Sequence, residues 1–107
     1  MKIVGVTACI AGVAHTYMAK VNLEKFAKKY DVDILVETQG AMGVEDRLEQ
    51  EDIDSADIVI FAVDTNVSDV DRFDGKTIIN KDTHDVVKYG ESVILEAIKL
   101  YEENGGK

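Results

Sequence analysis

The segment Lys2–Gly12, KIVGVTACIAG, decides the fold of this chain. Its first part, Lys2–Thr7, is short and rich in β-branched residues, which is typical of a buried strand in a parallel sheet. The segment then breaks into the small-residue loop 8–12. A helical pattern follows from about Val13 to Tyr30, with apolar residues at helical spacing and lysines on the other faces. A strand that passes through a short loop into a helix is the beginning of a strand–helix–strand unit.

The rest of the chain repeats this alternation. We expect strands at 32–38, 58–63 and 77–80, a weaker acidic helix at 44–54, and a last helix from 83 or 84 to about 103. A break in the last helix is expected at Gly90. This order predicts an α/β fold, a three-layer, doubly wound sheet of four parallel strands with helices on both faces. Such sheets bind ligands at the carboxyl ends of their strands.

The composition restricts the domain count and the classes of partner. The 107 residues fit one small domain, and 46% of them are apolar, which is enough for a core. The formal charge of −9 repels phosphate backbones and anionic lipid surfaces, so we expect no nucleic-acid partner. No stretch approaches the ~20 apolar residues of a membrane span, and the amino terminus has no signal-peptide layout. We therefore expect a cytoplasmic protein without direct membrane insertion.

Cys9, the only cysteine, lies just past the first strand in a loop that opens a helix. The backbone amides from Ile10 to about Thr16 are therefore expected to point at an anion, and the helix dipole adds positive potential there. A thiol in this position loses its proton more easily, and the same amides can hold a phosphoryl group on its sulfur. Gly12 allows a tight turn, His15 adds a donor, and Thr16 adds a hydroxyl.

Other interpretations of this loop remain open. A cysteine in a strand-to-helix turn is often only a small packed residue, and placement alone does not decide. A cysteine phosphatase has a Cys-x5-Arg loop whose Arg binds the phosphate, but here the sixth residue after Cys9 is His15. A nucleotide- or flavin-binding module of similar fold needs a G-x-G-x-x-G segment after the first strand, and this chain has none there. A phosphate loop without the Arg favours a phosphoryl carrier over a hydrolase.

Several separate motifs of the chain point to one known family. Around the cysteine they are VTAC at 6–9, Gly12 and AHTYMA at 14–19. Farther along the chain they are VETQG at 36–40, Gly43, Asp52-Ile53, Ala56-Asp57, Ile60, Asp64, Arg72-Phe73 and Gly75-Lys76. The first group resembles the active-site segment, and the second group the later segments, of the fructose-family enzyme IIB domain of the bacterial phosphoenolpyruvate-dependent sugar phosphotransferase system. The resemblance covers about residues 2–80 and implies the parallel strand order 2-1-3-4.

The resemblance implies a phosphotransferase that carries a phosphoryl group. Cys9 would accept the group from the phosphohistidine of an enzyme IIA donor and pass it to a sugar, fructose or a related hexose, at the enzyme IIC membrane transporter. The implied phosphate-binding loop consists of Ile10, Ala11, Gly12, Val13, Ala14, His15 and Thr16, and the implied rim of Glu37, Thr38, Gln39, Gly40 and Asp64. We expect one enzyme IIB domain at 1–104, a flexible tail at 105–107, and no cofactor. No metal is expected either, because Cys9 and His15 have no further ligands nearby in the sequence.

The chain departs from the family pattern at several positions. Ile10 and Ala11 follow the cysteine where Pro and Thr are common. Asp46 stands where Asn is usual, and Glu49 stands where a Ser or Thr would cap the next helix. These differences keep the nucleophile but leave the sugar open, and we expect specificity to reside mainly in the transporter.

Overall fold

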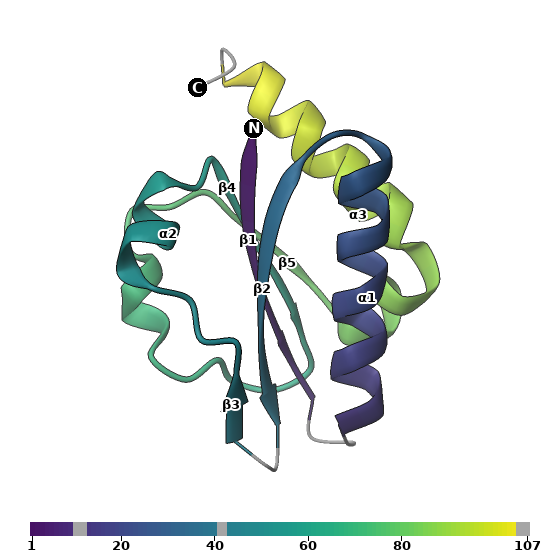
Figure 1. The fold of residues 1–107 in the computed structure, drawn as a ribbon, viewed down its shortest axis with the longest axis vertical. Coiled ribbons are helices and arrows are strands. Elements are labelled where there is room, and N and C mark those ends of the chain that lie inside the picture. Colours follow the sequence, from purple (N-terminus) through teal and green to yellow (C-terminus); the bar gives the residue numbers. More distant parts are fainter. Residues whose placement is uncertain (10–12, 41–42, 105–107) are drawn as a thin grey trace.

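The computed structural model describes residues 1–9, 13–40 and 43–104, which form a layered α/β fold (Figure 1). The predicted tail at 105–107 lies outside the described residues. The elements in chain order are β1 (Lys2–Ala8), α1 (Val13–Lys29), β2 (Asp33–Gly40), β3 (Gly43–Glu45), α2 (Gln50–Ser55), β4 (Ile58–Val63), the 3₁₀ helix η1 (Val70–Phe73), β5 (Ile78–Lys81) and α3 (Thr83–Glu103).

The sheet has the strand order β3-β2-β1-β4-β5. β1 pairs in parallel with β2 and β4, and β4 pairs in parallel with β5. The four parallel strands thus lie in the order β2-β1-β4-β5. Counted without β3, this is the predicted order 2-1-3-4, and the predicted fold class is confirmed. The structure adds β3, a strand of three residues that pairs antiparallel with the end of β2.

The prediction of an acidic helix at 44–54 is wrong over the first half of that segment. β3 occupies the beginning of that segment, and α2 begins only at Gln50. Between them Asp46 has a φ of 53°, a left-handed conformation that no α-helix accommodates. All three residues of β3 are exposed, so no hydrophobic alternation in the sequence could reveal the strand.

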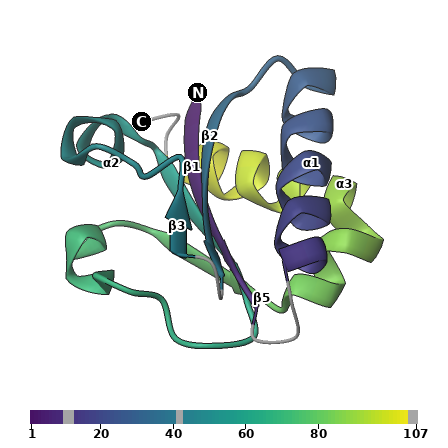
Figure 2. The same ribbon diagram turned by 60° about the horizontal axis from the view of Figure 1, so that its bottom comes forward.

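Each face of the sheet carries its own hydrophobic cluster, because successive strand residues point to opposite faces. On one face α1 and α3 pack through residues such as Leu23 and Ile94 against Ile60. On the other face Ile53 of α2 and Phe73 of η1 cover the remaining strand residues, including Val4, Val6 and Val59. Figures 1 and 2 show α1 and α3 together on one side of the sheet and α2 on the other. The predicted three layers are therefore present.

The helix α3 is interrupted beside Gly90, where the sequence predicts a break. Tyr89 has the non-helical angles φ −128° and ψ 39°. At the break, Asn22 of α1 donates from its Nδ2 to the carbonyl oxygens of Val86 at 3.0 Å and Val87 at 2.6 Å. A side chain of α1 thus satisfies backbone groups that the interrupted helix leaves available. Among the residues described here, no helix combines the length and the apolar character needed to cross a membrane.

Candidate active site around Cys9

Cys9 follows β1 directly and lies at the carboxyl edge of the parallel sheet. The neighbouring strands β2 and β4 run parallel to β1 and end beside it, at Gly40 and Val63. The Cys9 side chain is buried, with 4% of its surface exposed. The structure therefore places this residue at the edge where parallel sheets bind their ligands.

Among the residues that the structure describes, the Cys9 thiol contacts His15 and Asp64, which come from different elements. Its Sγ donates a hydrogen bond to Oδ2 of Asp64 at 2.9 Å and lies 3.7 Å from Nδ1 of His15. Asp64 follows β4, and its backbone N–H donates to the Ala8 carbonyl oxygen at 3.0 Å. That bond holds the end of β4 beside the cysteine. Asp64, which the family resemblance places on the rim, is thus in direct contact with the sulfur.

The predicted phosphate-binding loop is described in its second half alone. Ile10, Ala11 and Gly12 lie outside the described residues, whereas residues 13–16 form the first turn of α1. Within this turn Thr16 is buried and His15 is exposed. Because Nδ1 of His15 lies 3.7 Å from Cys9 Sγ, the amino end of this 17-residue helix adjoins the sulfur. The amino end of a helix favours an anion.

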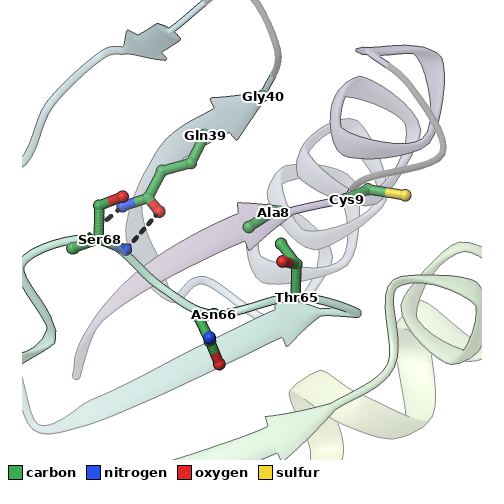
Figure 3. A pocket seen from close by; sticks show the side chains of 7 residues that line it. All are labelled: Ala8, Cys9, Gln39, Gly40, Thr65, Asn66 and Ser68. Carbon is green, nitrogen blue, oxygen red and sulfur yellow. Dashed lines mark hydrogen bonds between the residues drawn. The ribbon is translucent and has the colours of Figure 1, made fainter.

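A pocket of about 360 Å³ opens beside Cys9 (Figure 3). Its lining residues come from the ends of β1 and β2 and from the loop after β4: Ala8, Cys9, Gln39, Gly40, Thr65, Asn66 and Ser68. Two of the predicted rim residues, Gln39 and Gly40, are among them. Figure 3 shows the Cys9 sulfur pointing away from Gln39 and Ser68. The polar residues of the loop after β4 were not predicted, although their position directly after the strand at 58–63 could have indicated them.

Glu37 and Thr38 of the predicted rim are buried, and neither lines the pocket. The Glu37 carboxylate accepts two parallel hydrogen bonds from the Arg72 guanidinium, at 2.9 and 3.0 Å. It also accepts from the backbone N–H of Leu48 at 2.9 Å and from Nε2 of Gln39 at 2.7 Å. Burial raises the pKa of Glu37, but the hydrogen bonds from Arg72, Gln39 and Leu48 outweigh burial and hold this pKa below its ordinary value.

The Glu37–Arg72 pair supports one wall of the pocket. Gln39, which donates to Glu37, accepts a hydrogen bond through Oε1 from the Ser68 backbone N–H at 2.8 Å. Arg72 donates from Nε to the Asp69 carbonyl oxygen at 3.0 Å. The hydrogen bond to Glu37 raises the pKa of Arg72, so the guanidinium keeps its charge. The loop after β4 is thereby attached both to β2 and to η1. Over the described ranges, no group of three His, Cys, Asp or Glu side chains is placed to hold a metal ion.

Comparison with known proteins relates the whole of this architecture to one family. A family model described as the lactose/cellobiose-specific IIB subunit of the PTS system matches residues 4–96. A relative from Escherichia coli (strain K12), the PTS system fructose-like EIIB component 2, is 46% identical over 93 residues, which are 87% of this chain and 88% of that protein. A PTS system fructose-specific EIIB component from Haloferax volcanii is 45% identical over 102 residues, 95% of this chain and 64% of that protein.

A solved structure agrees with these relatives. The crystal structure of a domain from a fructose-specific IIABC component of Borrelia burgdorferi superposes with a TM-score of 0.86 and 45% identity. The match covers 92% of this chain and 93% of that domain. The family resemblance carried by the motifs is confirmed, and the matches extend into the carboxyl-terminal third, where the motifs are weak. The chain belongs to the enzyme IIB family, the phosphoryl carriers of the sugar phosphotransferase system.

Proposed function

We propose that Cys9 is the residue that carries the phosphoryl group, which it accepts from a phosphohistidine of enzyme IIA and gives to a sugar at enzyme IIC. The observation that carries this assignment is the position of the thiol. Cys9, the only cysteine of the chain, lies at the carboxyl edge of the sheet beside the amino end of α1. Helix amino ends favour anions, and a thiol can form the covalent intermediate that a carrier needs.

The two half-reactions are nucleophilic displacements at phosphorus. In the first, a lone pair of Cys9 Sγ forms the S–P bond while the P–N bond of the donor histidine breaks. In the second, a sugar hydroxyl oxygen forms the O–P bond while the P–S bond breaks. The amino end of α1 favours the negative charge of the phosphoryl group throughout. The loop, Ile10 to Thr16, is proposed as the phosphate cradle, and its first three residues lie outside the described residues.

Two kinds of relative support the donor, the transporter and the sugar. The Borrelia domain belongs to a protein named as a fructose-specific IIABC component of the PTS system. The E. coli and Haloferax relatives are named as fructose-like and fructose-specific. We therefore propose fructose or a related hexose as the acceptor. We place the protein in the cytoplasm, because a lone reactive thiol persists in a reducing compartment.

The proposed domain extends over residues 1–104. The family match over residues 4–96 supports a single enzyme IIB unit there. α3 ends at Glu103, one residue before the proposed boundary of the domain.

Intact-mass measurement tests the assignment of Cys9. The protein is incubated with phosphoenolpyruvate, the general phosphotransferase proteins and an enzyme IIA of a fructose system. We expect the wild type to gain one phosphoryl group and the Cys9→Ser variant to gain none. The serine hydroxyl is far harder to ionise, while its volume is similar, so the fold should persist. A Ser variant that gains the group at the wild-type rate would show that another residue is the carrier.

A further inference from the structure

We propose that Asp64 is a second catalytic residue, which takes the proton of the Cys9 thiol when the phosphoryl group arrives and returns a proton to the sulfur when the group leaves. This inference rests on the proposed function of Cys9. It concerns how the proton moves, whereas that proposal concerns where the phosphoryl group is carried.

The geometry of the thiol supports this role. The distance of 2.9 Å from Sγ to Oδ2 of Asp64 lies within the reach of a general base, and the thiol is the donor. Cys9 is 4% exposed, so bulk water has little access to its proton. Asp64 itself is exposed, and its backbone is held by the bond from its N–H to the Ala8 carbonyl oxygen. The carboxylate therefore connects a buried thiol with the surface that a partner must approach.

Charge gives a second argument. A phosphoryl group on Cys9 brings about two negative charges to within a few ångströms of Asp64. An ionised carboxylate there would repel the group, because like charges at close range disfavour each other. Transfer of the thiol proton to Asp64 neutralises the carboxylate at the moment when the phosphoryl group arrives. The contact that holds the thiol proton in the resting protein thus also weakens the repulsion while the S–P bond forms, until the proton passes on to the leaving histidine.

The proton balance closes in both half-reactions. In the first, the thiol proton passes from Sγ to Oδ2 of Asp64 while the S–P bond forms. The electron pair of the breaking P–N bond stays on the histidine nitrogen, which takes the proton from Asp64 and leaves as neutral imidazole. In the second, the sugar hydroxyl gives its proton to Asp64 as the O–P bond forms. The electron pair of the breaking P–S bond stays on the sulfur, which then takes a proton from Asp64.

His15 is the competing base, and two observations disfavour it. Its Nδ1 lies 3.7 Å from Sγ, farther than Oδ2 of Asp64. It also lies in the first turn of α1, the end of a helix that favours an anion. The start of α3 reaches the same edge, since Thr83 Oγ1 donates to the Ala8 carbonyl oxygen at 3.5 Å. Its titratable residues are Asp82, His84 and Asp85. The Asp82 carboxylate accepts from the His84 backbone N–H at 2.8 Å as a helix cap.

The test measures the rate of phosphoryl uptake by Cys9 from phosphorylated enzyme IIA of a fructose system, between about pH 6 and pH 9. We expect Asp64→Asn to lower this rate on the order of 10²-fold at neutral pH. The loss should shrink with rising pH, by up to roughly tenfold per unit, until the thiol ionises without a base. Asp64→Glu, which restores a carboxylate, should recover most of the rate. Asp33→Asn makes the same charge change at the amino end of β2 and should behave as the wild type.

Alkylation by iodoacetamide gives an independent measurement, because Cys9 is the only cysteine and reports alone. Asp64→Asn should shift the pH midpoint of alkylation downward relative to the wild type. A neutral amide then replaces the Asp64 carboxylate, whose negative charge favours the protonated thiol. This experiment needs no partner protein.

Each remaining outcome would overturn the inference. Uptake by Asp64→Asn within about twofold of the wild type at neutral pH would show that Asp64 takes no proton. A loss of equal size at every pH would indicate that Asp64 only supports the structure. A pH-dependent loss in His15→Gln but not in Asp64→Asn would identify His15 as the base. In all three cases the wild type still gains its phosphoryl group, so the proposed function stands. A wild type that gains none would remove both proposals.

Discussion

Cys9 has His15 at the position where a cysteine phosphatase has the Arg of its Cys-x5-Arg loop. The imidazole lies 3.7 Å from the sulfur and offers one nitrogen, whereas a guanidinium would form a two-pronged clamp on the phosphate oxygens. Arg72 also lies near the site, but both of its terminal nitrogens donate hydrogen bonds to the Glu37 carboxylate. Among the described residues at the thiol, therefore, no guanidinium is placed to stabilise a hydrolytic transition state. This agrees with a carrier, which must hold its phosphoryl group until an acceptor arrives.

Glu37 and Arg72 form a buried ion pair whose contribution to stability depends on pH. The pKa of Glu37 in the folded protein lies below its ordinary value of 4.5. The charged carboxylate therefore contributes stability that is fully present above the unfolded pKa and is lost as pH falls through the folded pKa. Truncating one partner of a buried pair leaves the other charge uncompensated, at a cost of about 3 kcal/mol.

We predict that Glu37→Gln lowers the free energy of unfolding by about 3 kcal/mol at neutral pH and makes it less dependent on pH below about 5. Urea unfolding at a series of pH values measures both effects. Glu24→Gln, an exposed position on α1, is the control and should change the free energy little. A Glu37→Gln variant whose stability falls with acid as steeply as that of the wild type would contradict the lowered pKa.

At the level of elements, the contact between α1 and α3 depends on Gly90. A Cβ built on Gly90 would lie 3.1 Å from Nδ2 of Asn22 and 3.2 Å from a ring carbon of Phe26. Asn22 cannot move freely, because its Nδ2 donates hydrogen bonds to the carbonyl oxygens of Val86 and Val87 at the break in α3. The absence of a side chain at Gly90 therefore allows the two helices to approach and the break to be capped.

Gly90→Ala should consequently lower the free energy of unfolding by about 1–3 kcal/mol, although alanine is the better helix former. Thermal unfolding followed by circular dichroism measures the change. Ser92→Ala, on an exposed part of the same helix, is the matched control. A more stable Gly90→Ala variant would mean that α3 straightens and that intrinsic helix propensity outweighs the contact with Asn22.

At the level of the whole molecule, apolar side chains are exposed on the first half of α1, the helix whose amino end adjoins Cys9. Tyr17, Met18 and Val21 are 37%, 50% and 59% exposed, and they line a shallow pocket together with Asn22 and Val87. They lie one to two turns beyond the helix end that adjoins the thiol. A donor histidine must come within bonding distance of the Cys9 sulfur, so this surface should contact enzyme IIA in a small, transient interface.

Chemical-shift mapping with enzyme IIA of a fructose system should therefore show its largest changes in the first half of α1 and in residues 64–69. Met18→Lys should weaken binding by roughly tenfold, because it places an ammonium group in the apolar part of the interface. Leu95→Lys, at an apolar position of α3 that is also exposed, should leave the affinity unchanged. Shifts confined to α3 would show that the partner approaches another face.

Local pattern in the sequence determined most of the architecture. The strand at 58–63 has the predicted bounds, α1 begins at the predicted Val13, and α3 breaks beside Gly90 as expected. These features depend on hydrophobic period and on backbone preference, which act over a few neighbouring residues. The placement of Cys9 between the first strand and a helix is also a local feature, because it follows from the order of two adjacent elements.

Only the tertiary structure decided which distant side chains meet at this edge. Asp64 and Cys9 are 55 positions apart, and their contact depends on the parallel register of β1 and β4. Arg72 reaches Glu37 across 35 positions and turns an expected rim residue into a buried ion-pair partner. β3 likewise exists through its pairing with β2 and not through its own pattern. Such contacts are set by the register and packing of whole elements, which no local period in the sequence encodes.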